Sequence, residues 1–264
     1  MEISRFKTDL SAPQAGTCRY CGAQLSAFYY FCPACAMPYK HPDLVVARPA
    51  APVPESDQEL ILRTVPQAGR LFFSFLAVIT AIWCLRVFTG LEASSAMLLG
   101  GLGLMAVTAV FSVQYLPALK AQLLHPGFDR WEAWAGLSAL PFLLVIDYGI
   151  MVWAAEYGGM QTASEMFAGF DKSTLFLLVV ILPGVTEEVA FRGLLQHWLR
   201  VRVRPLRAII IASALFAALH LSIFSAPYLF VLGLLLGWVK YRTGSLYPVI
   251  AMHVLHNAAV ILWF

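Results

Sequence analysis

From residue 70 onward, the sequence alternates long apolar runs with short polar loops. The apolar runs cover residues 71–89, 94–116, 134–154, 174–197, 207–224, 227–241 and 246–264. A helix of roughly 20 apolar residues crosses the hydrocarbon core of a bilayer. The pattern therefore predicts an all-α fold, a polytopic transmembrane helical bundle of about seven spans. The sixth run is short and the fifth contains polar residues, so these two depart most from a typical span.

The composition supports this fold class. Of the 264 residues, 60% are hydrophobic and 12% are charged, and the mean hydropathy is +0.73. Soluble proteins contain roughly 45–50% apolar and 25% charged residues, so we predict an integral membrane protein. The net charge of +3 is too small to indicate binding of nucleic acid. Residues 1–10 lack the apolar core of a signal peptide, so the first apolar run must direct the chain to the membrane.

Four of the five cysteines lie close together near the N-terminus. Cys18 and Cys21 form one C-x-x-C pair, and Cys32 and Cys35 form a second one after ten intervening residues. Two such pairs are typical of a zinc ribbon, in which four thiolates bind one structural Zn²⁺. The rival interpretation is a pair of disulfides or a redox site. The ribbon could dock a cytoplasmic partner or serve only as a cap.

The chain is therefore predicted to have three parts. They are a zinc ribbon over residues 1–40, a Pro/Ala-rich extended linker over 41–69 and a transmembrane domain over 70–264. Basic residues gather in the loops after the second, fourth and sixth runs, which favours the cytoplasmic side for these loops and for the N-terminus. Thiols stay reduced in the cytoplasm, which favours zinc over disulfides. The compact length and the appended ribbon favour a bacterial inner membrane.

The fourth apolar run contains two adjacent carboxylates and an arginine at membrane depth. Such charges are costly unless they are paired, hydrated or in use. On a helix, Glu188 and Arg192 lie on one face and can neutralise each other. Glu187 is rotated by about 100° from Glu188 and has no such partner within its own helix. We therefore predict a structural pair and one carboxylate available for chemistry, although both could instead line a water-filled crevice.

Two further polar clusters lie in the later runs. His220 follows Phe216 by one helical turn, and His253 and Asn257 share one face of the last run. His256 lies only about 60° away from His253 on the same helix. At roughly 1.5 Å per residue, the three clusters lie about 10 to 20 Å from the cytoplasmic ends of their runs. They could therefore meet in one pocket that opens towards the cytoplasm.

These residue types support the activation of water. A buried carboxylate can act as a general base, and an imidazole can ligate a metal, donate a proton or stabilise an oxyanion. An asparagine amide can donate to a developing oxyanion. No serine, cysteine or threonine stands beside a histidine as a nucleophile would, since Ser222 lies on a different face from His220. Hydrolysis by activated water is therefore favoured over an acyl-enzyme.

Together the clusters resemble the motifs of the CPBP family, the CAAX-processing and bacteriocin-processing intramembrane proteases, also called the Abi family. The matching motifs lie in the expected order within residues 130–264 and read Glu187-Glu188-x-x-x-Arg192, Phe216-x-x-x-His220 and His253-x-x-x-Asn257. The resemblance implies an intramembrane endopeptidase, often labelled a metalloprotease, in which Glu187 activates water. It implies a catalytic site made of Glu187, Glu188, Arg192, His220, His253 and Asn257. His220 and His253 would hold a metal, a water or the oxyanion, and Asn257 would support the oxyanion.

The sequence leaves several alternatives open. His256 rather than His253 could face the pocket, and a mechanism without a permanent metal ligand is also proposed for the family. The expected partners are the bilayer and a membrane-associated peptide or protein substrate, whether prenylated or not. The main alternative function is a non-catalytic membrane scaffold or immunity protein that recruits a partner through the ribbon. An ion-coupled transporter is disfavoured because no internal repeat pairs the two halves of the chain.

Overall fold

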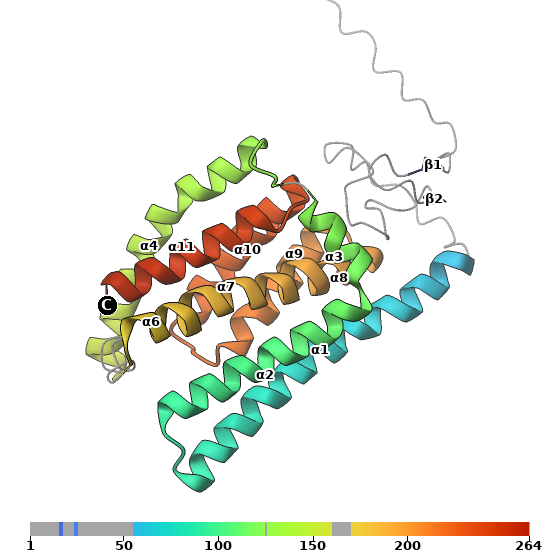
Figure 1. The fold of residues 1–264 in the computed structure, drawn as a ribbon. Helices are drawn as coiled ribbons and strands as arrows, with labels where there is room; N and C mark the ends of the chain where they lie inside the picture. The colour runs from blue at the N-terminus through green and yellow to red at the C-terminus, as the bar shows by residue number, and fades with distance from the viewer. Residues whose placement is uncertain (1–15, 18–23, 26–54, 125, 160–169, 264) are drawn as a thin grey trace, which may run out of the picture.

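The computed structural model describes residues 16–17, 24–25, 55–124, 126–159 and 170–263 (Figure 1). These residues are helical almost throughout, which confirms the predicted all-α class. The helices, with η marking a π-helix, are α1 (Glu55–Thr89), α2 (Ala93–Gln114), α3 (Leu116–Leu123), α4 (Trp131–Gly158), α6 (Lys172–Leu175), η1 (Phe176–Ile181), α7 (Leu182–Glu187), η2 (Glu188–Leu195), α8 (Gln196–Arg202), α9 (Pro205–Leu219), α10 (Ala226–Thr243) and α11 (Tyr247–Trp263). Two short strands, β1 (Gly16–Thr17) and β2 (Gln24–Leu25), pair antiparallel.

Four helical segments of the described chain are long and apolar enough to cross a bilayer. They are Pro66–Thr89, Ser94–Gln114, Trp131–Gly158 and Lys172–Arg202. Large apolar side chains on these segments face outward, as lipid contact requires; Phe73, Val113 and Phe142 are 65%, 74% and 74% exposed. The protein is therefore an integral membrane protein. Helices α9, α10 and α11 lie on the last three predicted runs but have only 15, 18 and 17 residues. The count of about seven spans stays a prediction.

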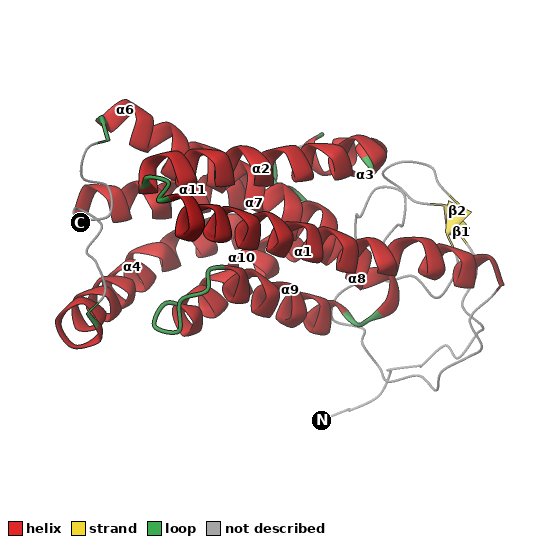
Figure 2. Cartoon of the chain, turned by 90° about the horizontal axis from the view of Figure 1, so that it is seen from below, coloured by secondary structure: helices red, strands yellow, loops and turns green. Residues whose placement is uncertain are grey.

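The helices form a bundle with a helical hairpin on one side and α4 on the other (Figures 1 and 2). The hairpin consists of α1 and α2, which pack against each other. Between the two sides, α9 packs against α10, α7 packs against α11, and both α10 and α11 pack against α4. Buried apolar side chains from the middle helices form the core and include Phe191, Leu195, Trp198, Phe216 and Leu236.

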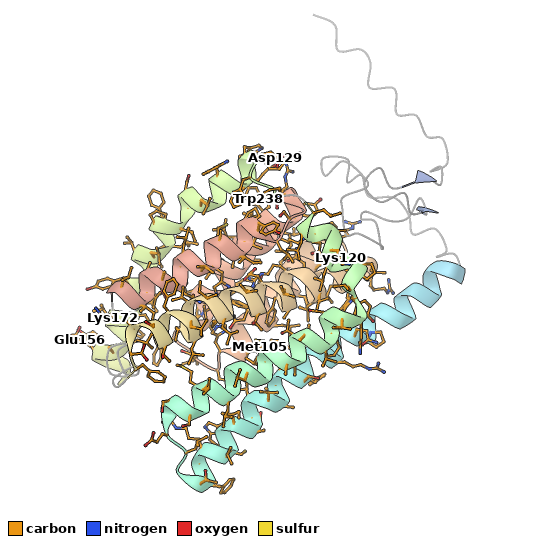
Figure 3. All side chains as sticks on the ribbon, viewed as in Figure 1. Met105, Lys120, Asp129, Glu156, Lys172 and Trp238 are labelled. Atoms are coloured by element: carbon orange, nitrogen blue, oxygen red, sulfur yellow. The ribbon has the colours of Figure 1, made fainter. Side chains whose placement is uncertain are left out.

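Charged residues in and beside the ends of the helices lie at opposite ends of the bundle. Figure 3 shows Glu156 and Lys172 at one end, and Lys120 and Asp129 at the other. This separation agrees with the predicted alternation of loops, in which the basic loop after α2 faces away from the loop after α4.

The fourth run is one continuous helical stretch in which α-helical and π-helical turns alternate from Lys172 to Arg202. Pro183 accounts for part of this irregularity. It has no N–H to donate to the carbonyl of Val179, and its ring would clash with that carbonyl in a regular α-helix. The π-helical turns of η1 end directly before α7, in which Pro183 lies in the first turn. Such turns are frequent at functional sites, and η2 begins at Glu188.

The predicted linker over residues 41–69 is wrong for its C-terminal part. Helix α1 begins at Glu55, so residues 55–69 are helical rather than extended. No glycine or proline interrupts residues 55–65, and Glu, Gln, Leu and Arg are good helix formers. Pro66 lies inside the helix and did not end it. The prolines that predict an extended chain lie before Glu55, apart from Pro66, which the helix accommodates.

Two other boundaries differ from the prediction. Helix α9 ends at Leu219, before the predicted end at residue 224, because Leu221 adopts a left-handed conformation with φ of 51°. Residues 116–123, predicted as the end of the second run and the following loop, form the separate helix α3. Tyr115, with φ of −120°, interrupts the helix, and Pro117 lies in the first turn of α3, where a missing N–H is tolerated.

The cysteines of the predicted zinc ribbon, Cys18, Cys21, Cys32 and Cys35, lie outside the described residues. The paired strands β1 and β2 flank the first C-x-x-C pair, since β1 ends directly before Cys18 and β2 begins shortly after Cys21. The zinc ribbon itself stays a prediction.

Candidate active site

The candidate site is assembled where α7 and η2 approach α11. Gly184 permits this approach, because a Cβ atom at its position would lie 2.7 Å from Cγ2 and 3.3 Å from the backbone nitrogen of Val254. Small residues allow membrane helices to approach closely in this way. Glu187 lies one turn after Gly184, and His253 directly precedes Val254. The absence of a side chain at Gly184 therefore allows α7 to approach α11 closely enough for the glutamates to lie near His253.

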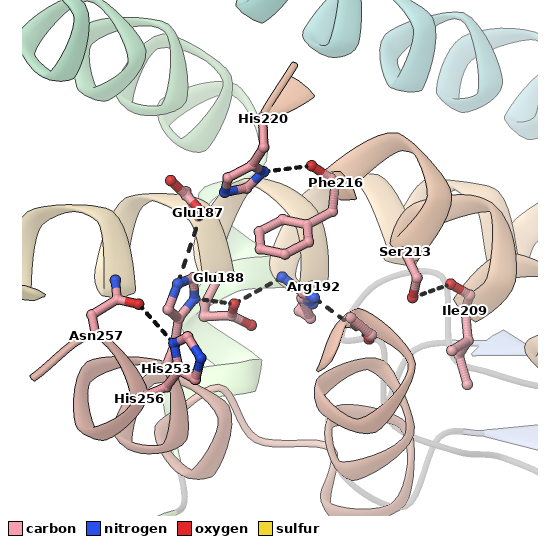
Figure 4. A network of polar contacts seen from close by, with 11 residues as sticks. Glu187, Glu188, Arg192, Ile209, Ser213, Phe216, His220, His253, His256 and Asn257 are labelled. Atoms are coloured by element: carbon pink, nitrogen blue, oxygen red, sulfur yellow. Dashed lines mark hydrogen bonds and ion pairs between the residues drawn. The ribbon is translucent and has the colours of Figure 1, made fainter. Parts of the chain in front are cut away.

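Glu188 is held by two buried partners (Figure 4). Its Oε1 atom accepts hydrogen bonds from Arg192 Nη1 at 2.8 Å and from His253 Nδ1 at 2.7 Å. The side chains of Glu188 and Arg192 are 0% and 1% exposed, so the pair is shielded from water. Charge-assisted hydrogen bonds are strong in such an environment. The predicted pair between Glu188 and Arg192 is confirmed.

Glu187 lies in a different environment. Its side chain is 18% exposed, and among the described residues its buried Oε2 atom has no hydrogen-bond partner. This atom lies 3.9 Å from His253 Nε2, which is too far for a direct hydrogen bond. One water molecule can bridge such a separation. Because His253 Nδ1 donates to Glu188, the Nε2 atom of a neutral His253 ring is an acceptor.

His220 reaches the site from the end of α9. Its Nδ1 atom lies 2.9 Å from the carbonyl oxygen of Phe216. A carbonyl can only accept, so Nδ1 carries the proton and Nε2 of the neutral ring keeps a lone pair. In Figure 4 the His220 ring points towards the Glu187 carboxyl group. His220 is exposed at the helix end, directly before the left-handed Leu221.

The ring of Phe216 connects several of these residues. It meets the rings of His220 and His253 edge-on, with centroid separations of 4.8 and 6.0 Å. The guanidinium carbon of Arg192 lies 4.5 Å from the centroid of the same ring. A cation over an aromatic face is attracted by the ring. The Phe216 ring therefore contacts Arg192 and both histidines.

His256 belongs to a second buried network. Its Nε2 atom lies 2.7 Å from the Tyr228 hydroxyl oxygen and 3.6 Å from Asp147 Oδ2. Its Nδ1 atom lies 3.1 Å from Oδ1 of Asn257, the predicted oxyanion donor. Which histidine faces the glutamates was open from the sequence, and in the structure it is His253.

Asp147 and Tyr228 were not among the predicted site residues. Asp147 carried a signal, because an isolated carboxylate within an apolar span is a functional candidate. Tyr228 carried no signal that distinguishes it from other aromatic residues near helix ends. Its contact with His256 joins α10 to α11 and depends on how these helices pack.

The site has donor types that suit a metal ion. His220 and His253 each direct Nδ1 to an oxygen acceptor, which is typical of histidines that ligate metals through Nε2. Within the described part of the chain, however, no group of three or more His, Cys, Asp or Glu side chains gathers closely enough to hold a metal. The residues therefore do not form a complete ligand set in this arrangement. A metal at His220 and His253 stays a prediction.

One of the comparisons with known proteins finds a family to which part of the chain is similar. Residues 170–259 match the model of a family described as Rce1-like, type II CAAX prenyl endopeptidase Rce1-like. The match extends from the start of the fourth run into α11 and includes all six residues of the predicted site. No curated protein and no solved structure that was compared matches the chain.

Proposed function

We propose, from the similarity of residues 170–259 to a family of CAAX prenyl endopeptidases, that this protein is an intramembrane endopeptidase in which Glu187 activates water. The observation that carries the proposal is the difference between the two glutamates. Glu188 is neutralised at Oε1 by Arg192, whereas in the described part of the chain no arginine or lysine pairs with Glu187, whose side chain is 18% exposed. A carboxylate kept at membrane depth without an arginine or lysine partner is best explained by a functional role.

The separation between Glu187 and His253 suits a bound water. Both Oε2 of Glu187 and Nε2 of a neutral His253 are acceptors, and they lie 3.9 Å apart. One water could donate an O–H to each of them. The water oxygen would then direct a lone pair towards the carbonyl carbon of a substrate peptide bond.

Hydrolysis then requires two proton transfers. Glu187 takes a proton from the water as the new C–O bond forms, and the carbonyl oxygen becomes an oxyanion. The Asn257 amide donates one N–H to Val179 and has a second N–H for the oxyanion. Glu187 returns its proton to the peptide nitrogen as the C–N bond breaks, which yields a carboxyl group and an amine. Glu188 and Arg192 hold His253 in place throughout.

The orientation in the membrane is also proposed. The basic loops after α2, α8 and α10 would face the cytoplasm, together with the N-terminus and the opening of the site. The membrane would be a bacterial inner membrane, and the substrate a membrane-associated peptide or protein. Similarity to CAAX endopeptidases makes a prenylated peptide one candidate substrate class.

Replacing Glu187 tests the proposal. Glu187→Gln removes the base but keeps the shape of the side chain, so activity should fall by about 10²–10⁴-fold while folding is unchanged. New protein termini in membranes from cells that express wild type or Glu187→Gln would be catalogued by mass spectrometry. Glu156→Gln, an exposed position at the end of α4, is the matched control. Identical termini with equal amounts of inserted protein would refute the enzyme and favour the scaffold.

Metal content tests the predicted zinc. Purified protein should contain about one zinc ion per chain, bound by four thiolates. The Cys18→Ser and Cys21→Ser double variant should lose this zinc, as measured by elemental analysis. Zinc that remains in the double variant and disappears in His253→Ala would instead place a metal at the candidate active site.

A further inference from the structure

A second buried polar cluster lies next to the candidate site. It consists of Asp147 on α4, Tyr228 on α10 and His256 on α11, which are 5%, 3% and 6% exposed. None of the three belongs to the sequence motifs of the predicted site. Ionisable groups at membrane depth are costly unless they are paired or in use. His256 directly precedes Asn257, so the cluster borders a residue of the site.

The contacts of Asn257 determine how its amide is oriented. Its Nδ2 atom lies 3.0 Å from the carbonyl oxygen of Val179. That carbonyl lacks its regular α-helical donor, because the residue four positions later is Pro183. A carbonyl can only accept, so the amide nitrogen must face Val179. The amide oxygen therefore faces His256.

The same reasoning fixes the proton on His256. Its Nδ1 atom lies 3.1 Å from the amide oxygen of Asn257, which can only accept, so Nδ1 must donate. Its Nε2 atom lies 2.7 Å from the Tyr228 hydroxyl oxygen, and the two rings are stacked with 25° between their planes. In the neutral ring, Nε2 accepts a hydrogen bond from the Tyr228 hydroxyl group. The neutral tautomer is thus set from both sides.

Asp147 lies close enough to His256 to balance the charge of a protonated ring. Its Oδ2 atom lies 3.6 Å from His256 Nε2. If His256 is protonated, Nε2–H can donate to the Tyr228 oxygen, and the Asp147 carboxylate balances the charge. In both charge states Nδ1–H donates to Asn257. The orientation of the amide is therefore independent of the charge of His256.

We propose that His256, supported by Tyr228 and Asp147, is a positioning residue that fixes the direction of the Asn257 amide. Figure 4 shows His256 and Asn257 joined in this way, with His253 turned to the glutamates. The inference rests on the proposed function, in which the second N–H of Asn257 stabilises the oxyanion. His256 acts through Asn257. Loss of an oxyanion donor typically lowers kcat by about 10²–10³-fold, so its direction matters.

Two substitutions at His256 separate positioning from packing. The amide nitrogen of asparagine is as many bonds from Cβ as Nδ1 of histidine, and that of glutamine as many as Nε2. His256→Asn should therefore keep the donor to Asn257 and most of the activity. His256→Gln should lose that donor and lower kcat by about 10–100-fold at unchanged KM, the range for residues that orient metal ligands. Equal kcat values for the two variants would overturn the inference.

Tyr228→Phe tests the support from the other side. It removes the hydroxyl group but keeps the ring that stacks on His256, so kcat should fall by less than His256→Gln lowers it. Tyr247→Phe, at an exposed tyrosine at the start of α11, is the matched control. Thermal unfolding in detergent shows whether each variant is folded. An unchanged kcat in folded Tyr228→Phe would remove Tyr228 from the inference.

A double-mutant cycle provides the deciding measurement. If His256 acts through Asn257, His256→Gln should have no further effect on kcat in an Asn257→Ala background. Losses that multiply would instead show that His256 acts independently. A failure of the proposed function looks different, because Glu187→Gln would then be as active as wild type. An essential Glu187 with a normal His256→Gln refutes only the positioning role.

Discussion

His253 and His256 lie three residues apart on α11 and contact different carboxyl groups. Around His253, Oε2 of Glu187 and Oε2 of Glu188 have no hydrogen-bond partner among the described residues. Around His256, both ring nitrogens are engaged, at 2.7 Å with Tyr228 and at 3.1 Å with Asn257. The ring of His253 thus lies beside carboxylate oxygens that have no hydrogen-bond partner, whereas both nitrogens of the His256 ring have one.

The difference separates two tasks that buried polar groups can perform. A buried ring whose two nitrogens both have hydrogen-bond partners is held in one orientation. Buried acceptors without a partner are costly and need a reason to persist. These contacts fit the proposed roles, in which the network of His253 performs the chemistry and the network of His256 positions Asn257. Single substitutions can disturb one network, both or neither.

The largest effect on stability should come from breaking the charge balance around His253. Arg192→Met leaves the carboxylate of Glu188 buried without its cation, which should lower the free energy of unfolding by about 3–5 kcal/mol. Adding Glu188→Gln should restore part of this loss, because the uncompensated charge is gone. Unfolding in detergent by denaturant, followed by circular dichroism, measures both. Arg207→Met, at an exposed position, is the control. A stable Arg192→Met would mean that Glu188 is not a structural charge.

A smaller effect should follow from separating α7 from α11, which disturbs both networks. A Cβ atom at Gly184 would meet the side chain and the backbone of Val254, so Gly184→Ala should cost about 1–3 kcal/mol of stability and also lower activity. Gly149 on α4 has open space around its Cβ position. Gly149→Ala should therefore stabilise slightly, through helix propensity alone.

Thermal unfolding and cleavage assays on both glycine variants test this prediction. Equal melting temperatures and equal cleavage rates for Gly184→Ala and Gly149→Ala would contradict the close approach of α7 to α11.

The smallest effect should come from a residue outside both networks. Asp171 caps α6, and the hydrogen bonds from the side chain and backbone N–H of Thr174 hold the pKa of Asp171 below its ordinary value. Its stabilising effect should be present above the ordinary aspartate pKa and be lost as the pH falls through the lowered value. Asp171→Ala should slightly lower the melting temperature at neutral pH, and by less in strong acid, where Asp171 is uncharged. A difference of the same size at both pH values would contradict a charge-dependent cap.

Much of the fold could be predicted because it depends on features within single segments. The apolar runs indicated where helices lie, and all seven correspond to helices of the structure. Helix ends were less predictable. Residues 55–69 read as a linker because of the prolines nearby, and α9 ended early because Leu221 turned left-handed, which no local pattern indicated. Ends of this kind are decided by packing rather than by propensity.

Composition alone indicates an integral membrane protein, and spacing along one helix alone indicates the pairing of Glu188 with Arg192. That His253 rather than His256 contacts the glutamates becomes visible once the helices are packed together. The two side chains differ by about 60° around α11, and the helices packed on each side decide which one faces which partner. The packing of the helices also explains why Asp147 and Tyr228 contact His256, since α4 and α10 bring them there from distant parts of the chain.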